Sequence, residues 1–208
     1  MDNVDLNVCN VVSSYLNPSD VKVLTQLSKN AYSIWRNHML YSYNQHGKDE
    51  SLIDQNGLKW IVCDCTSDDL CDIIKKRLNM VNISFNTNYN QPIELLKLCK
   101  KLQYVIFGSK FNQSIDPLKL CVQLQSITFG VAFNKSIIPL RSCTQLRSIV
   151  LGAKFNQSIE SLRSCIHLHS IVLGANFDQS IESLGSCIHL HSIVFGHNFN
   201  QSIKSLGF

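Results

Sequence analysis

A repeat of constant length runs through most of this chain and limits its possible folds more than any other feature. From residue 80 onward, similar residues recur every 22 positions without insertion or deletion. A short constant period predicts that each copy forms one turn of a solenoid and packs mainly against its neighbours. The clearest columns are Phe85, Phe107, Phe129, Leu151, Leu173 and Phe195; Asn90, Asn112, Asn134, Asn156, Asp178 and Asn200; and Cys99, Cys121, Cys143, Cys165 and Cys187.

The spacing within one copy predicts a short strand followed by a non-helical return. Apolar residues fall at intervals of three and then two, and the copy ends in Leu168-x-x-Ile171-x-Leu173, the pattern of a leucine-rich repeat. Ile171 and Leu173 are expected to point into the core, and Gly174 is expected to permit the bend that ends the strand. The threefold spacing before Leu168 suits a 3₁₀ turn or an extended segment better than an α-helix. The residues expected to face outward are His169, Ser170 and Val172.

Five of the nine cysteines occupy one column of the repeat. In stacked turns their side chains would point the same way, about 4.8 Å apart if the backbone there is strand-like. Disulfides need closer, converging Cβ atoms. The column therefore predicts buried, reduced thiols that pack as small apolar groups.

The asparagine column is expected to point inward and to satisfy backbone groups at a bend, because an amide side chain both donates and accepts hydrogen bonds. Asp178 breaks this column with a side chain that accepts but does not donate when ionised. On this interpretation, Asp178→Asn is expected to raise the melting temperature.

The register continues upstream in weaker form. The pattern Leu58-x-x-Ile61-x-Cys63 precedes its counterpart at 80–85 by 22 residues. Ile74 extends a further column of the repeat, which consists of Leu96, Leu118, Leu140, Leu162, Leu184 and Leu206. Residues 52–79 are therefore predicted to form a degenerate capping repeat. The last turn lacks a polar cap, which predicts an unpaired edge or end-to-end self-association.

The repeats resemble FNIP repeats, a family related to leucine-rich repeats and named for a Phe-Asn-x-Pro core. Residues 89–93 read Tyr-Asn-Gln-Pro-Ile and keep the proline, whereas 111–115, 155–159 and 199–203 read Phe-Asn-Gln-Ser-Ile. The resemblance covers residues 80–208. It implies a leucine-rich-repeat-like solenoid from an amoeba or from a giant virus that infects amoebae.

The N-terminal segment has a different texture and resembles an F-box. Helical spacing and the helix-start signal Asn17-Pro18-Ser19-Asp20 predict three short helices within residues 4–40. The F-box resemblance implies binding to a Skp-type adaptor of a cullin–RING ubiquitin ligase. Val4-Asp5 stands where the family usually has Leu-Pro. A helical cap that merely shields the solenoid is the alternative. The positions expected to contact the adaptor or the helical core are Val8, Val12, Leu16, Pro18, Val21 and Leu24.

Several other kinds of chemistry are disfavoured by the sequence. The Cys165-x-His167 pairing recurs with the repeat, whereas catalysis needs one particular constellation, so no enzyme and no cofactor are expected. Four histidines at 167, 169, 189 and 191 could approach a metal, but repetition of one turn explains them more simply. The net charge of +4 is modest and scattered, which predicts no nucleic-acid partner. No apolar run reaches the length of a membrane span and no secretory signal is visible, so a cytoplasmic protein without a membrane partner is expected.

Together these patterns predict an α+β protein with a helical F-box-like segment (1–45), the capping repeat (52–79) and a β-solenoid with a parallel strand ladder (80–208). The expected function is a substrate receptor that links a target protein to a ubiquitin ligase. A binding scaffold without a ubiquitin role is the alternative. The outer face of the strand ladder is the expected target-binding surface, polar and mildly basic. Its predicted residues are Gln103, Tyr104, Gln125, Arg147, His169 and His191.

Overall fold

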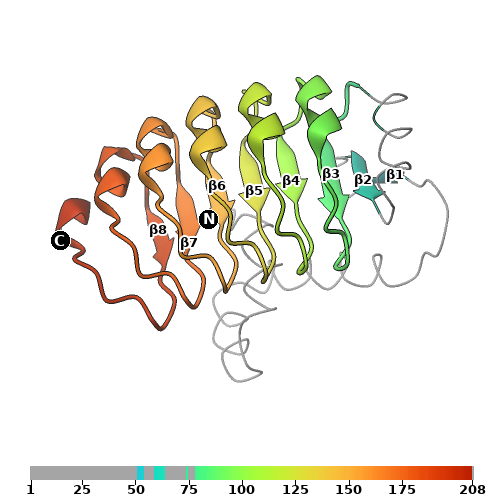
Figure 1. Cartoon of the computed structure of the whole chain (residues 1–208). Coiled ribbons are helices and arrows are strands. Elements are labelled where there is room, and N and C mark those ends of the chain that lie inside the picture. The colour runs from blue at the N-terminus through green and yellow to red at the C-terminus, as the bar shows by residue number, and fades with distance from the viewer. Residues whose placement is uncertain (1–50, 54–58, 64–73, 75–77, 208) are drawn as a thin grey trace.

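The computed structural model describes residues 51–53, 59–63, 74 and 78–207. They form a coil with an eight-stranded sheet along one side, in which the strands lie in the order of the chain (Figure 1). The six residues predicted to contact an adaptor lie outside the described residues. The strands are β1 (Ser51–Ile53), β2 (Lys59–Cys63), β3 (Asn82–Phe85), β4 (Tyr104–Ile106), β5 (Ser126–Thr128), β6 (Ser148–Val150), β7 (Ser170–Val172) and β8 (Ser192–Val194).

The strand register confirms the predicted parallel ladder. Strands β2 to β8 pair in parallel with their successors, and every paired residue lies 22 positions from its partner. Ile127, for example, pairs with Ile149, and the same offset joins Ile61 of β2 to Ile83 of β3. Strand β1 differs because it runs antiparallel to β2. The described sheet therefore has a parallel array with one antiparallel strand at its N-terminal edge.

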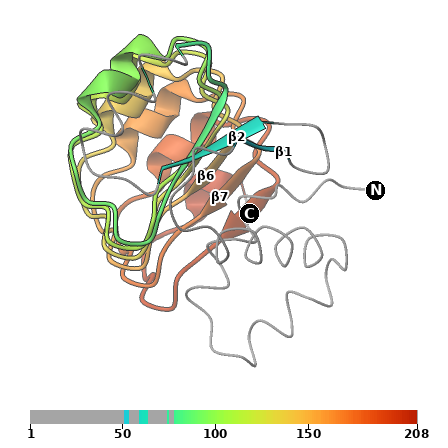
Figure 2. The same ribbon diagram turned by 90° about the vertical axis from the view of Figure 1, so that its right-hand side faces the viewer.

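In the described residues, six 3₁₀ turns lie across the coil from the sheet, which is one of the two alternatives that the threefold spacing left open (Figure 2). In the first five turns the backbone N–H of the column cysteine closes the turn at its end. Each turn begins directly after a member of an isoleucine column, which consists of Ile93, Ile115, Ile137, Ile159, Ile181 and Ile203. A 3₁₀ turn advances farther per residue than an α-helix, so it fits within a 22-residue coil. The turns are η1 (Glu94–Leu98), η2 (Asp116–Leu120), η3 (Ile138–Ser142), η4 (Glu160–Ser164), η5 (Glu182–Ser186) and η6 (Lys204–Leu206).

The core is a continuous apolar spine in which like residues lie above one another. Residues of the predicted columns are nearly inaccessible in the middle turns, as Ile159, Leu162 and Cys165 illustrate. A second aromatic column, which the sequence interpretation did not assign to the core, lies after the strands and is stacked along the coil. Its members are Tyr89, Phe111, Phe133, Phe155, Phe177 and Phe199.

The spacing between turns increases with distance from the sheet. Neighbouring strands in a sheet lie about 4.8 Å apart. The ring centroids of Phe107 and Phe129, just after the strands, are 5.5 Å apart. In the second aromatic column, Phe111 and Phe133 are 6.1 Å apart. The turns therefore fan outward, and the sheet lies on the inner side of a curved coil.

The asparagine column faces solvent and does not point inward as predicted. Asn134 and Asn156 are exposed, and the side-chain oxygen of Asn134 accepts a hydrogen bond from the backbone N–H of Asn156 at 3.0 Å. The same bond links successive members from Asn90 to Asn200. The column does satisfy backbone groups at a bend, as expected, but from the surface, because the chain there has left the sheet without entering the core.

Asp178 makes the same hydrogen bonds as the asparagines of this column. The reason for expecting Asp178→Asn to raise the melting temperature is therefore removed. Its Oδ1 accepts from the backbone N–H of Asn200 at 2.8 Å and from Nε2 of Gln201 at 2.9 Å. Asn156 makes the equivalent two contacts with its oxygen. The role requires an acceptor, and a carboxylate is a good one.

Gly174 serves a different purpose from the predicted bend. Among the described residues the positive-φ position is Gly207, so Gly174 does not use the left-handed region. A Cβ placed on Gly174 would instead overlap the carbonyl group of Gly152 in the preceding turn, and Gly130 meets Gly108 in the same way. The glycines therefore allow neighbouring backbones to approach closely.

Candidate interaction surface

A column of polar residues stands at the start of the strands and forms the candidate surface, here called the strand-start column. Its backbone is held in line because each N–H donates to the carbonyl of the residue one turn earlier, for example Arg147 to Gln125 at 2.7 Å and His169 to Arg147 at 2.8 Å. Arg147 and His191 are exposed, whereas the other members are half-buried. The column consists of Gln103, Gln125, Arg147, His169 and His191.

Tyr104 lies beside this column at the first residue of β4. It is half-buried, and its hydroxyl lies 3.4 Å from Oε1 of Gln125. Tyr104 and Gln125 therefore form one polar unit that spans two turns. The structure thus brings together all six residues predicted for target binding, in a single strip along the strand starts.

The rest of the strand face is less open than predicted. Ser126 and Ser148, which follow the strand-start column, are buried, and so are Thr128 and Val150 two residues later. Val172, expected to face outward into solvent, is also buried. Alternation along a strand determines which face a side chain leaves from, but not what covers that face. The accessible part of the face is therefore the strand-start column and the C-terminal end near β8.

Four histidines cluster where the strand-start column reaches the last two turns. The ring centroids of His169 and His189 are 5.9 Å apart, and those of His169 and His191 are 5.5 Å apart. His167 stacks on His189 at 5.9 Å. Nδ1 of His191 lies 3.1 Å from the carbonyl oxygen of His189, whereas Nδ1 of His169 is buried without a hydrogen-bond partner.

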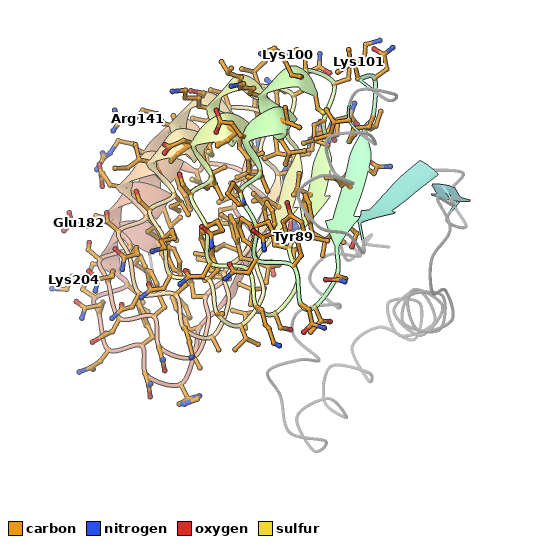
Figure 3. All side chains as sticks on the ribbon, turned by 45° about the vertical axis from the view of Figure 1, so that its right-hand side comes forward. Tyr89, Lys100, Lys101, Arg141, Glu182 and Lys204 are labelled. Atoms are coloured by element: carbon orange, nitrogen blue, oxygen red, sulfur yellow. The ribbon has the colours of Figure 1, made fainter. Side chains whose placement is uncertain are left out.

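The charge of the strip is positive because the carboxylates lie elsewhere. In residues 78–207 the acidic residues occupy the 3₁₀ turns or the return segments. Two of them form exposed pairs with neighbours on the same turn, Lys97 with Glu94 and Arg163 with Glu160. Figure 3 shows Arg141 and Glu182 on these outer turns. Arg147 and His191 are therefore exposed with no carboxylate from the described residues in their column.

The cysteine column is a buried, reduced ladder, as predicted. All five thiols are free and buried. Sγ of Cys143 lies 3.6 Å from the carbonyl oxygens of both Leu118 and Cys121 in the preceding turn, so the thiol can donate to either. Burial raises the pKa of Cys143 to about 12, with smaller contributions from Cys121 and Cys165. A thiol that keeps its proton is a poor nucleophile. The ladder therefore has a structural role and is unsuited to thiol chemistry.

The described surface has one hollow on the outer turns and one at the C-terminal end of the coil. One of about 190 Å³ is lined by residues of the outer turns, including Arg141 and Glu160. Another of about 460 Å³ lies against the last turn. Within the described residues no group of three or more histidine, cysteine or acidic side chains is arranged to hold a metal ion. None of the helices in that part of the chain has both the length and the apolarity to cross a membrane.

Comparison with solved structures identifies the architecture. Internalin C2 from Listeria monocytogenes aligns with a TM-score of 0.56 at 14% identity, covering 64% of this chain and 59% of the internalin. The internalin InlF from the same organism aligns with a TM-score of 0.48 at 19% identity, over 61% of this chain and 36% of that one. The circular leucine-rich-repeat protein CroV588 gives a TM-score of 0.49 at 27% identity, over 60% of this chain and 18% of its own.

The alignment with internalin C2, together with the strand register, places the described chain among solenoids of the leucine-rich-repeat type. The chain spans between about a fifth and three fifths of the solved chains that it matches. No protein-family model matches the sequence, and no curated protein matches it significantly. The similarity therefore defines the fold of the repeats.

Proposed function

We propose that this protein is a non-catalytic interaction module that binds a target protein along the strand-start column. The observation that carries the proposal is the alignment of Gln103, Gln125, Arg147, His169 and His191 at the strand starts, held in register by backbone hydrogen bonds. Leucine-rich-repeat solenoids commonly present extended binding surfaces of this kind. An elongated strip suits a polypeptide better than a small molecule, which is usually enclosed in a pocket.

The chemistry of the strip indicates the kind of target. Arg147 is exposed and offers a planar guanidinium that can hold a carboxylate with two hydrogen bonds. The glutamines and histidines add neutral donors and acceptors. A polypeptide segment with acidic and amide side chains is therefore the proposed ligand. Arg147→Glu is expected to weaken target binding strongly, whereas the outer-turn variant Arg141→Glu is expected to leave it unchanged.

More specifically, we propose that the protein is a cytoplasmic substrate receptor whose N-terminal segment binds a Skp-type adaptor of a cullin–RING ubiquitin ligase. Support comes from the F-box resemblance of that segment, from the resemblance of the repeats to the FNIP family, and from a solenoid suited to presenting a target. The protein itself would catalyse no reaction. The adaptor would be held by the apolar residues Val8, Val12, Leu16, Val21 and Leu24 together with Pro18.

A two-part capture experiment tests both levels of the proposal. Full-length wild-type protein is used to capture partners from an amoebal lysate, and bound proteins are identified by mass spectrometry. Leu16→Asp and Pro18→Ala are expected to abolish adaptor capture without loss of the target. Arg147→Glu is expected to do the reverse. Adaptor capture that survives both N-terminal changes would refute the ligase role.

A binding scaffold without a ubiquitin role is the second candidate. It predicts a target that depends on Arg147 and no adaptor under any condition. Loss of every partner in the Leu16→Asp variant alone would instead indicate that the N-terminal segment contributes to target binding, and would contradict the strand-start column as the sole site.

A further inference from the structure

The first two 3₁₀ turns expose apolar side chains that the repeat does not require. Leu98 and Leu120 are the last residues of η1 and η2, and they are 44% and 40% exposed. Val122 is 52% exposed. Because the same position is serine in the next three turns, the geometry of the turn does not depend on an apolar side chain there. These serines are Ser142, Ser164 and Ser186.

Unpaired cations surround these apolar side chains. Lys100 lies just after η1, where its backbone N–H donates to the carbonyl oxygen of Leu98 at 3.0 Å, and Lys101 follows it. Lys119 directly precedes Leu120 in η2. The three lysines are exposed and belong to neither of the ion pairs that the described residues form on the outer turns. We call this surface the outer patch, and it consists of Leu98, Lys100, Lys101, Lys119, Leu120 and Val122.

The third turn removes a carboxylate from the margin of the outer patch. Ile138 is the first residue of η3 and is 66% exposed. Arg141, three residues later, therefore lacks the ion pair that Lys97 and Arg163 make with the acidic first residues of their own turns. Figure 3 shows Lys100, Lys101 and Arg141 along the same outer edge of the coil. The residues that begin the other turns from η1 to η5 are Glu94, Asp116, Glu160 and Glu182.

The outer patch lies on a convex surface and contains no hollow. Because the turns fan outward from the sheet, the row of 3₁₀ turns lies on the outer side of the curve. Neither of the two hollows described above is lined by a residue of the patch. A peptide helix usually binds in a groove, and an anchoring side chain usually fills a pocket. A broad and deformable anionic surface needs neither, so a lipid bilayer fits the patch better than an acidic polypeptide does.

We propose that the outer patch docks this protein on the surface of an anionic bilayer. The three lysines face the charged headgroups, because the negative potential of such a surface attracts basic residues. Leu98, Leu120 and Val122 enter the boundary between headgroups and acyl chains, as the apolar residues of interfacial proteins do. The basic residues are scattered along the sequence, which therefore predicts no membrane partner, but the repeat brings them onto neighbouring turns.

The curvature of the coil limits the contact and leaves the target-binding surface free. A flat bilayer touches a convex row of turns at only a few of them, so the contact is confined to the turns from η1 to η3. The strand-start column lies across the coil from these turns. Docking on a bilayer therefore neither requires nor blocks the binding of a target protein.

Co-sedimentation of the full chain with vesicles tests the charge of the patch. The wild type is expected to bind vesicles of phosphatidylcholine with about 30% phosphatidylserine at about 0.1 M salt, and not vesicles of phosphatidylcholine alone. Lys100→Glu combined with Lys101→Glu is expected to lower the partition coefficient at least about tenfold. The matched control is Lys110→Glu with Lys154→Glu, which makes the same change in charge at exposed positions of the bends after the strands. The control is expected to cost at most about threefold.

A pair of serine variants tests the apolar part of the patch. Leu120→Ser introduces the residue that later turns carry at this position, and it is expected to weaken vesicle binding about fivefold. Ile166→Ser is the matched control, because Ile166 is 46% exposed but lies two turns beyond Val122 on the curve. It is expected to change binding at most about twofold. Circular dichroism melts check that each variant is folded.

Three outcomes would overturn the proposal. The first is a wild type that does not bind anionic vesicles, and the second is a control pair of lysines as damaging as the pair in the patch. The third is equal binding by Leu120→Ser and the wild type. A wild type that ignores vesicles but binds a labelled peptide of alternating glutamate and leucine through Lys100 and Lys101 would assign the patch to a protein partner instead.

Tryptophan fluorescence tests the depth and place of the contact. Val122→Trp is expected to shift its emission to shorter wavelength with anionic vesicles and to be quenched by brominated lipids. Asn176→Trp is the control, because Asn176 is exposed at a bend after the strands. The wild type gives the background from Trp35 and Trp60. Equal quenching of the two introduced tryptophans, or none at position 122, would refute the proposed orientation.

Discussion

The cysteine ladder allows a sharp test of how the core is held together. At Cys143, in the middle of the coil, replacement by alanine removes the sulfur, whereas replacement by serine exchanges the thiol for a smaller and more polar hydroxyl. The sulfur lies 3.6 Å from the carbonyl oxygens of Leu118 and Cys121. That is a suitable distance for a thiol donor but too long for a hydroxyl, which needs about 2.5–3.0 Å.

The wild type is expected to be the most stable, the alanine variant less stable and the serine variant the least stable. Because a C–O bond is shorter than a C–S bond, the hydroxyl would stand still farther from both carbonyls, and no water can reach a side chain that is 0% exposed. Removal of the sulfur is expected to cost about 1–2 kcal/mol, as lost apolar burial plus a small cavity. An unsatisfied buried hydroxyl is expected to add about 1–3 kcal/mol.

The measurement is the free energy of unfolding in urea, followed by circular dichroism under reducing conditions. Cys187 is the matched control, since it is 5% exposed and lines the hollow against the last turn. A hydroxyl there is close to solvent, so the difference between serine and alanine should shrink. A Cys143→Ser variant as stable as Cys143→Ala, or more stable, would refute the argument that the ladder is a set of long thiol contacts.

Three further outcomes follow from the structure. Burial raises the pKa of Cys143 from 9.0 to about 12, so between these values the folded state holds a proton that the unfolded state loses. The free energy of unfolding should therefore fall as the pH rises from about 9 toward 12. In urea titrations, Cys143→Ala should reduce the slope of that fall by at most about 1.4 kcal/mol per pH unit. Hydrogen bonds from Gln201 and Asn200 lower the pKa of Asp178 in the folded state. The contribution of Asp178 to stability is therefore present above pH 3.8 and is lost as the pH falls through the lowered folded pKa. Asp178→Asn should remove this dependence of stability on acid pH without raising the melting temperature at pH 7. Gly130→Ala should destabilise the coil by about 1–3 kcal/mol in thermal melts, because the added Cβ meets the backbone of the preceding turn; an unchanged melting temperature would show that the turns can separate at little cost.

The sequence predicted those parts of the fold that follow from the repeat length. A fixed offset of 22 residues dictates which residues pair, and the structure confirms it in pairs such as Ile127 with Ile149. Threefold spacing excluded an α-helix and left a 3₁₀ turn or an extended segment, of which the structure has the first, and a column of cysteines predicted a reduced ladder. Each of these inferences depends on one geometry that repeats along the chain. A wrong interpretation of one copy would therefore be corrected by comparison with the other copies.

Orientation outside the strands was harder to predict. The asparagine column was expected inside the coil, yet Asn134 and its equivalents face solvent, because a repeat shows that residues are equivalent without showing the direction in which they point. The same difficulty concealed the second aromatic column, although Phe111 and Phe133 recur with the same period. A large apolar residue next to each asparagine was the available signal, since such a residue needs burial more than an amide does.

The candidate surface was predicted in position but not in extent. Arg147 and His191 stand directly before β6 and β8, and they are exposed. Alternation along the strands could not indicate that the outward side chains of Ser148 and Val150 are buried. Burial of a sheet face depends on groups that are distant in sequence. A local sequence pattern contains no information about those groups.

The outward fan of the turns restricts the shape of any molecule that can touch several strand starts at once. Because Phe111 and Phe133 stand 6.1 Å apart while the strands keep the tighter spacing of a sheet, the strip lies on the inside of an arc. A flat ligand would rest on the rims of that arc and leave Arg147 untouched. A bulging surface, or a slender segment that follows the hollow of the bend, could reach every position along it.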